Sequence, residues 1–329
     1  MLAGALLALV AAATFALNNA AFRRGSLEGT VAQAMGISLS LGVGLYLVAA
    51  SVTGGWNALA VLPSQSILML CAAGILHFAW GRYCNFRATK AMGANLVGPV
   101  QQSSLIVTLA LAVTVLGEAL TPLRFLGIGL IILGPAISLR VRRANVDADA
   151  PATQFKPRLM EGYTFALLSA TGYGTSPILV RSALENTSIA TSLAGGLVAY
   201  LAAGAVMAVT LLWPGRVAHV LSVKAAPARW FTASGVLVAL SQMAGYVALA
   251  LAPVSIVTPI QRLSLVFRVY ANSVLNRDHE IVGPRIWAAT GTGLIGVLAL
   301  TVSTDWIIDV LRLPQPAAAV LGWQWPDIR

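Results

Sequence analysis

The chain has 329 residues, of which 58% are hydrophobic and only 10% are charged, and its formal net charge is +10. A soluble domain carries about 25% charged residues, so this composition excludes an ordinary soluble protein and indicates a polytopic membrane protein. The basic residues lie mostly in short segments between apolar runs, where they set membrane topology rather than bind nucleic acid.

Ten apolar segments follow one another along the chain, most of them long enough to cross a hydrocarbon core about 30 Å thick. They are 2–21, 30–52, 66–86, 93–116 and 121–139, and then 162–180, 188–213, 230–252, 254–275 and 285–304. Thr121-Pro122 and Gly283-Pro284 are typical helix starts. We therefore predict an all-α polytopic membrane protein with ten transmembrane helices.

The two halves of the chain are related in sequence. Residues 98–105, GPVQQSSL, align with residues 258–265, TPIQRLSL, at a constant offset. Five helices per half is an odd number, so a second copy must enter the membrane in the opposite orientation. The sequence therefore predicts two inverted five-helix repeats, an arrangement found in secondary transporters. The predicted divisions are 1–139 for the first repeat, 140–161 for a polar linker, 162–304 for the second repeat and 305–329 for an interfacial or loose tail.

The loop charges agree with an inverted second half. In the first half, basic residues concentrate in the first and third loops, and in the second half they concentrate in the second and fourth. The first-half residues counted in this way are Arg23, Arg24, Arg82, Arg87 and Lys90. The positive-inside rule places these loops and the linker in the cytoplasm and both termini outside. We expect a multi-pass protein of the cell membrane, with the bacterial inner membrane favoured.

Several stretches resemble the EamA type of the drug/metabolite transporter superfamily. They are RATKAMGANLVGPVQQ at 87–102, LGEALTPLRFLGIGLIILG at 116–134 and the second-half echo ALAPVSIVTPIQ at 250–261. The resemblance covers nearly all of 2–304 and implies ten helices, inverted repeats and a central cavity. In the second half, Arg277-Asp278 stands where the family has Gly-Glu, and Glu280 follows. Family members are usually drawn with both termini inside, opposite to the charge count.

Polar residues share one helical face in the fourth and ninth spans. Gln101 and Gln102 lie on this face in the first half, and Gln261 and Arg262 lie on it in the second half. An arginine near the bilayer centre costs about 2.5–3.5 kcal/mol, so Arg262 is expected to line a cavity and to bind a polar, perhaps anionic, ligand. A structural role for it is the alternative. Arg268 lies nearer the helix end and is expected to snorkel to the interface.

Other spans add further candidates. The predicted substrate-binding residues are Asn18, Asn19, His77, Gln101, Gln102, Thr175, Ser176, Gln261 and Arg262. For His77 a packing role is the stronger alternative. Pro99 and Pro259 each free a backbone carbonyl, which a cavity can satisfy, although a plain kink explains them equally well.

The chain has 11 acidic residues, and all of them fall in predicted loops, at helix ends or in the tail. Glu118 and Asp278 are expected to be structural loop acids. Because no predicted span carries a carboxylate in its interior, the sequence argues against cation–proton exchange through an intramembrane acid. The same absence argues against metal-dependent chemistry in the bilayer. We expect no catalytic residue, metal or cofactor.

These patterns favour a secondary active transporter, an exporter or exchanger, that moves a small polar metabolite such as an amino acid or organic anion by alternating access. Multidrug efflux or a lipid-linked flippase on the same fold is the alternative. A polytopic membrane enzyme is disfavoured, because the chain has neither HExxH nor GxSxG. The expected partners are the small-molecule substrate and the lipid bilayer, with the protein a monomer or homodimer.

Overall fold

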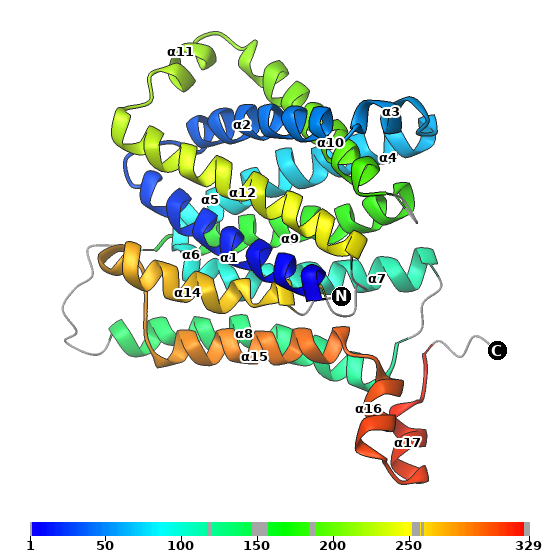
Figure 1. Ribbon diagram of the computed structural model, residues 1–329. Coiled ribbons are helices and arrows are strands. Elements are labelled where there is room, and N and C mark those ends of the chain that lie inside the picture. Colours follow the sequence, from blue (N-terminus) through cyan, green and yellow to red (C-terminus); the bar gives the residue numbers. More distant parts are fainter. Residues whose placement is uncertain are drawn as a thin grey trace.

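Helices make up almost all of the regular structure in the computed structural model of the protein (Figure 1). The structure describes residues 2–116, 120–146, 157–184, 188–251, 257 and 260–325. Within these ranges the first half contains α1 (Leu2–Gly25), α2 (Val31–Val52), α3 (Gly55–Ala60), α4 (Ser64–Gly74), the π-helix η1 (Ile75–Gly81), α5 (Arg82–Met92), α6 (Ala94–Gln101), α7 (Ser103–Leu116) and α8 (Pro122–Val146).

The described residues of the second half also form long and short helices. These are α9 (Leu159–Ala183), α10 (Ile189–Leu211), α11 (Arg216–Leu221), α12 (Ala225–Leu251), α14 (Ser264–Leu275), the 3-10 helix η2 (Arg277–His279), α15 (Pro284–Thr301), α16 (Thr304–Leu311) and α17 (Gln315–Leu321). The tail thus forms two short helices, which extend away from the rest of the bundle in Figure 1.

Among the residues that the structure describes, five helical segments are long and apolar enough to cross a membrane. They are Leu2–Gly25, Val31–Val52, Ser64–Met92, Ile189–Leu211 and Ala225–Ala248. A sixth is added if α15 and α16, which are bent by 92° to one another, count as one span. Length and composition therefore support a polytopic membrane protein, whereas the number ten stays a prediction.

The helix boundaries follow the sequence signals in some places and depart from them in others. As predicted, α8 begins at Pro122 and α15 begins at Pro284. The third span is longer than expected, because α4, η1 and α5 continue without a break from 64 to 92. The linker predicted at 140–161 is shorter at both ends, since α8 runs on to Val146 and α9 already starts at Leu159.

Connections from both halves meet at one end of the bundle, which we call the basic end. Arg87 donates to Glu161 at 3.0 Å, and the Arg158 amide donates to the Ala91 carbonyl at 2.8 Å. These contacts hold the start of α9 against the end of α5. At the opposite end, the Leu120 and Trp325 backbones pair with each other at 2.6 and 2.9 Å. The tail is therefore anchored beside the start of α8.

Close helix packing fills the interior between α2, α4 and α10. Tyr200 lies 5.0 Å from Tyr46 and 4.0 Å from Phe78, measured between ring centroids. Gly74 brings α4 against the α10 backbone so closely that a β-carbon there would overlap the Ala199 carbonyl. Small residues allow such close approach between membrane helices, where dispersion contacts replace the hydrophobic effect.

We predict that Gly74→Ala destabilises the protein by about 1–3 kcal/mol, the usual cost of an added methylene in a packed interior. The measurement is thermal unfolding of the purified protein in detergent. Gly44→Ala is the matched control, because nothing lies within 4 Å of a β-carbon at Gly44 and alanine favours the helix. Equal midpoints for the two variants would show that α4 and α10 do not approach as described.

Candidate functional site

Polar side chains are buried in the interior of this apolar protein, and they come from both halves of the chain. They lie on α1, α5, α6, α9, α12 and α14, and they are Asn18, Asn19, Arg82, Asn85, Gln101, Gln102, Ser169, Ser176, Ser234, Arg268 and Asn272. We call this set the polar layer. Buried polar groups are retained where hydrogen bonds satisfy them or where function requires them.

The two asparagines of α1 face different neighbours, although both were predicted to bind substrate. The Asn18 side-chain oxygen accepts a hydrogen bond of 2.6 Å from Ser234 on α12. The Asn19 oxygen accepts one of 3.3 Å from Asn85 on α5, while its amide donates to the Phe15 carbonyl at 2.8 Å. Asn19 thus lies toward the first-half helix α5, and Asn18 toward the second half.

Gln101 links three helices at the break between α6 and α7. Its side-chain oxygen accepts a hydrogen bond of 3.0 Å from Arg268 on α14, and its amide donates to Ser169 on α9 at 3.3 Å. Pro99 stands inside α6, and the Gln102 amide bonds back to the Pro99 carbonyl at 3.2 Å, which ends the helix there. The sequence prediction of a kink at Pro99 is consistent with this break.

The remaining candidates are placed less closely together. Gln102 is buried with its side-chain oxygen unpaired among the described residues, near Gly293 on α15. Thr175 donates to the Thr171 carbonyl of its own helix at 2.9 Å. Gln261 lies against Gly245 on α12. Arg262 is partly exposed, and its Nε atom is buried with no partner in the described part of the chain.

The other predicted residues differ in burial, and two of them lie outside the described residues. Ser176 is buried on α9, and its role in substrate binding stays a prediction. Glu118 and Pro259 lie outside the described residues. Asp278 is exposed in η2, as expected of a loop acid. The expectation that Arg268 snorkels to the interface is wrong, because its side chain is 3% exposed and bonded to Gln101.

Arg82 is a residue that the sequence analysis placed incorrectly. It was counted among loop charges, but it opens α5 directly after the π-helix η1 and is only 2% exposed. Its Nη2 atom donates to the Tyr200 hydroxyl at 2.9 Å, and its guanidinium carbon lies 4.9 Å from the Phe78 ring centroid. π-Helical turns are frequent at functional sites, and this one could have been suspected only from the structure.

His77 lies on the same π-helical turn. Its ring is 4.6 Å from that of Tyr173 on α9 and 4.8 Å, edge-on, from that of Phe78. These ring contacts fit the packing alternative for His77. They also place it beside Arg82 and Tyr173, within reach of the polar layer.

Glu280 is the buried acid that the sequence analysis missed. It lies in the loop between η2 and α15, as expected, but it is 3% exposed and forms an ion pair of 2.9 Å with Arg23 of α1. Its two oxygens accept hydrogen bonds from the Ala94 and Asn95 amides at 2.6 and 3.0 Å, at the start of α6. One sequence signal did exist: Glu280 stands two residues beyond the position where the family has its Gly-Glu.

Further hydrogen bonds surround this ion pair at the basic end. Arg23 also donates to the His279 carbonyl at 2.5 Å, and Asn276 donates to the Ala20 carbonyl at 3.0 Å. Burial raises the pKa of Glu280, while Arg23 and the amides of Asn95 and Ala94 oppose that rise. As the pH falls, Glu280 therefore takes up a proton at a higher pH than an exposed glutamate does, which weakens its contact with Arg23.

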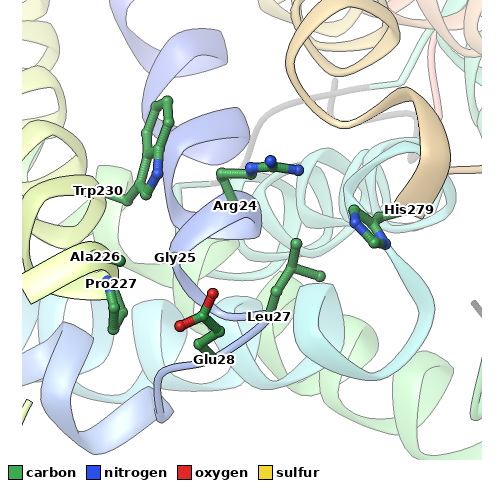
Figure 2. A pocket seen from close by; sticks show the side chains of 8 residues that line it. All are labelled: Arg24, Gly25, Leu27, Glu28, Ala226, Pro227, Trp230 and His279. Carbon is green, nitrogen blue, oxygen red and sulfur yellow. The ribbon is translucent and has the colours of Figure 1, made fainter. Parts of the chain in front are cut away.

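A surface pocket of 390 Å³ lies directly outside this ion pair. Figure 2 shows Arg24 and His279 on one side of it and Trp230 and Pro227 on the other, with Glu28 at its edge. His279, which lines the pocket, accepts a hydrogen bond from Arg23 through its carbonyl, so the pocket and the ion pair are in contact through this residue. The pocket therefore lies at the basic end, beside the Arg23–Glu280 pair.

We predict that Glu280→Gln lowers the free energy of unfolding by about 3–5 kcal/mol, because it leaves Arg23 buried without its counter-charge. Thermal unfolding in detergent measures the loss. Glu161→Gln is the matched control, since its partner Arg87 is 44% exposed and such pairs contribute about 0–1 kcal/mol. A Glu280→Gln protein as stable as the control would mean that Glu280 is not ionised in its buried position.

Comparisons with known proteins bear on the first half of the chain. Residues 2–140 match the family model described as the EamA-like transporter family. No curated protein matches, whereas 16 chains of solved structures do. One of these, titled only "Crystal structure of protein", is 17% identical and covers 94% of this chain and 98% of its own, with a TM-score of 0.49. Residues 2–140 are thus similar to the EamA-like transporter family, which is part of the drug/metabolite transporter superfamily.

Proposed function

We propose that this protein is a secondary active transporter, an exporter or exchanger, that moves a small polar metabolite such as an amino acid or organic anion. The observation that carries the proposal is the polar layer, in which α1, α5 and α6 of one half meet α9, α12 and α14 of the other inside an apolar bundle. Transporters bind their substrates near the bilayer midplane, where two repeats meet. The match of residues 2–140 to a transporter family supports the same conclusion.

We also propose ten membrane-crossing segments arranged as two inverted five-helix repeats, 1–139 and 162–304. Inversion requires the first loop of one half to lie at the same end as the second and fourth loops of the other. Three contacts agree with this requirement: Thr30 lies 3.0 Å from His219, Gln33 donates to the His219 carbonyl at 3.1 Å, and Arg23 pairs with Glu280. The first loop of the first half thus contacts the second and fourth loops of the second half.

In this proposal, alternating access opens the polar layer first to one end of the bundle and then to the other. Movement at the basic end must separate α1 from the loop that follows α14, because the Arg23–Glu280 pair joins them. At the opposite end, the tail contacts the segment before α8 through Thr304 and Thr121, whose hydroxyls lie 3.0 Å apart. Each end therefore has its own set of contacts that can break while the other set stays closed.

We predict that the basic end faces the cytoplasm of a bacterial cell, because loop arginines and lysines gather there. In a protein whose Cys71 and Cys84 are replaced by serine, an impermeant maleimide applied to intact cells should label Val61→Cys and not Ala218→Cys. Val61 is exposed in the connection after α3, and Ala218 is exposed on α11 near the basic end. Permeabilised cells should show both labelled, and the reverse pattern in intact cells would invert the assignment.

We predict that the purified protein in liposomes catalyses exchange of a polar solute and returns that solute chemically unaltered. The experiment loads liposomes with a mixture of unlabelled organic acids and amino acids and follows the entry of each labelled compound. Mass spectrometry of the recovered solute separates transport from enzymatic conversion. Protein-free liposomes provide the background rate, and a chemically changed product would favour the alternative of a membrane enzyme.

A further inference from the structure

The charges buried in the described interior do not balance. The buried charged side chains there are Arg23, Arg82, Arg268 and Glu280. Glu280 is engaged by Arg23 and by two backbone amides. Within the described residues, the Arg82 guanidinium donates a hydrogen bond to the neutral Tyr200 hydroxyl, and the Arg268 guanidinium donates one to the neutral side-chain oxygen of Gln101.

An imbalance of this kind is costly in a protein interior. Moving an unpaired ion out of water costs several kcal/mol even after the protein relaxes, and one neutral hydrogen bond recovers only part of this. In membrane proteins, buried ionisable residues accordingly mark substrate or ion pathways. Two buried arginines without a bonded carboxylate among the described residues therefore need a specific reason to be present.

Each guanidinium retains donors that point to a further partner. Arg82 Nη1 and Arg268 Nε are buried and have no hydrogen-bond partner among the described residues. Aromatic rings hold both groups in place: Arg82 lies 5.3 Å from the Tyr200 ring centroid, and Arg268 lies 5.7 Å from that of Phe15. Ring contacts orient a guanidinium while leaving its N–H edge available, as recognition of a planar carboxylate requires.

The two arginines belong to one region of the polar layer. A chain of contacts joins them. Asn85, one turn along α5 from Arg82, donates to Asn19 at 3.3 Å, and Asn19 donates to the Phe15 carbonyl at 2.8 Å. The Phe15 ring centroid lies 5.7 Å from the Arg268 guanidinium carbon. Gly81, the residue before Arg82, approaches the Tyr173 ring so closely that a β-carbon would lie 2.9 Å from it. Arg82 therefore reaches this region from the first half of the chain, and Arg268 reaches it from the second.

We infer that Arg82 and Arg268 together bind the carboxylate groups of the transported solute, which is a small organic anion. This inference rests on the proposed transport function and narrows it to one substrate class. A dianion balances both buried charges, and Tyr173 and Asn85 add neutral hydrogen-bonding groups beside it. A zwitterionic amino acid fits less well, because the one buried carboxylate in the described interior, Glu280, is already paired.

Because the two arginines come from different halves, the solute would itself join them. A bound dianion offsets the repulsion between two like charges and holds α5 and α14 together, whereas the empty site leaves the charges uncompensated. Substrate binding would then favour an occluded state of the interior. This gives a physical reason why exchange of one anion for another would be faster than net movement.

The first test measures binding without transport. Thermal unfolding of the purified protein is followed with succinate, malate and citrate and, separately, with succinamide and alanine. At least one carboxylate should raise the midpoint in a saturable way, whereas the neutral diamide and the zwitterion should not. Stabilisation by succinamide or alanine alone, or by none of the compounds, overturns the inference.

The second test assigns the binding to these two residues. Arg82→Gln and Arg268→Gln should each weaken the affinity for the stabilising carboxylate by more than about tenfold, the scale of one charged hydrogen bond. Arg87→Gln is the matched control, since Arg87 is exposed on the same helix as Arg82, and it should change the affinity by less than about twofold. Unchanged affinity in both glutamine variants overturns the assignment.

Folding and transport are kept separate from binding in this design. If Arg82→Gln does not yield folded protein, Arg82→Lys retains the charge but loses the planar fork, and it should still weaken carboxylate binding. Carboxylate binding without movement across liposomes would contradict the proposed transport while leaving this site intact. Movement of neutral or zwitterionic solutes without any anion binding would support transport and overturn this inference.

Discussion

The arrangement of the basic end depends on one buried carboxylate. Glu280 receives the Arg23 side chain from α1 and two backbone amides from the first turn of α6. The first N–H groups of a helix have no partner within the helix, and leaving them unpaired in an apolar interior is expensive. Glu280 supplies both the missing acceptors and a negative charge at the positive end of the helix dipole. It thereby lets α6 begin inside the protein.

The backbone just before α6 is built around the same carboxylate. Gly93 has a φ of +89°, a value that side-chain-bearing residues rarely adopt, and a β-carbon there would lie 2.9 Å from Glu280 Oε2. Only glycine satisfies both conditions, so the sharp connection from α5 to α6 and the position of Glu280 require each other. The direction of α6 in turn carries Gln101, the eighth and last residue of the helix, toward Arg268. The ion pair and the polar layer are thus parts of one connected structure.

The sequence located the helices more reliably than the neighbours of individual side chains. Apolar length predicted the spans, and Thr121-Pro122 and Gly283-Pro284 predicted two helix starts, because these signals act within a few residues. Arg82 was misplaced because its neighbours Arg87 and Lys90 made the segment look like a loop, although the helix continues to Met92. Asn18 and Asn19 were grouped together, but adjacent positions on a helix point about 100° apart and reach different helices.

By itself, the sequence determined that this protein is apolar and helical, and it predicted two related halves, since composition, segment length and a repeated motif are all local or periodic properties. The tertiary structure alone decided which charges are buried and what they touch. Arg268 could have reached the interface or the interior with the same local sequence, and packing of α14 against α1 and α6 placed it inside. Glu280 looked like any loop acid until α1 and α6 converged on it. Burial of a charge depends on segments far apart in the chain, and no short stretch of sequence contains that information.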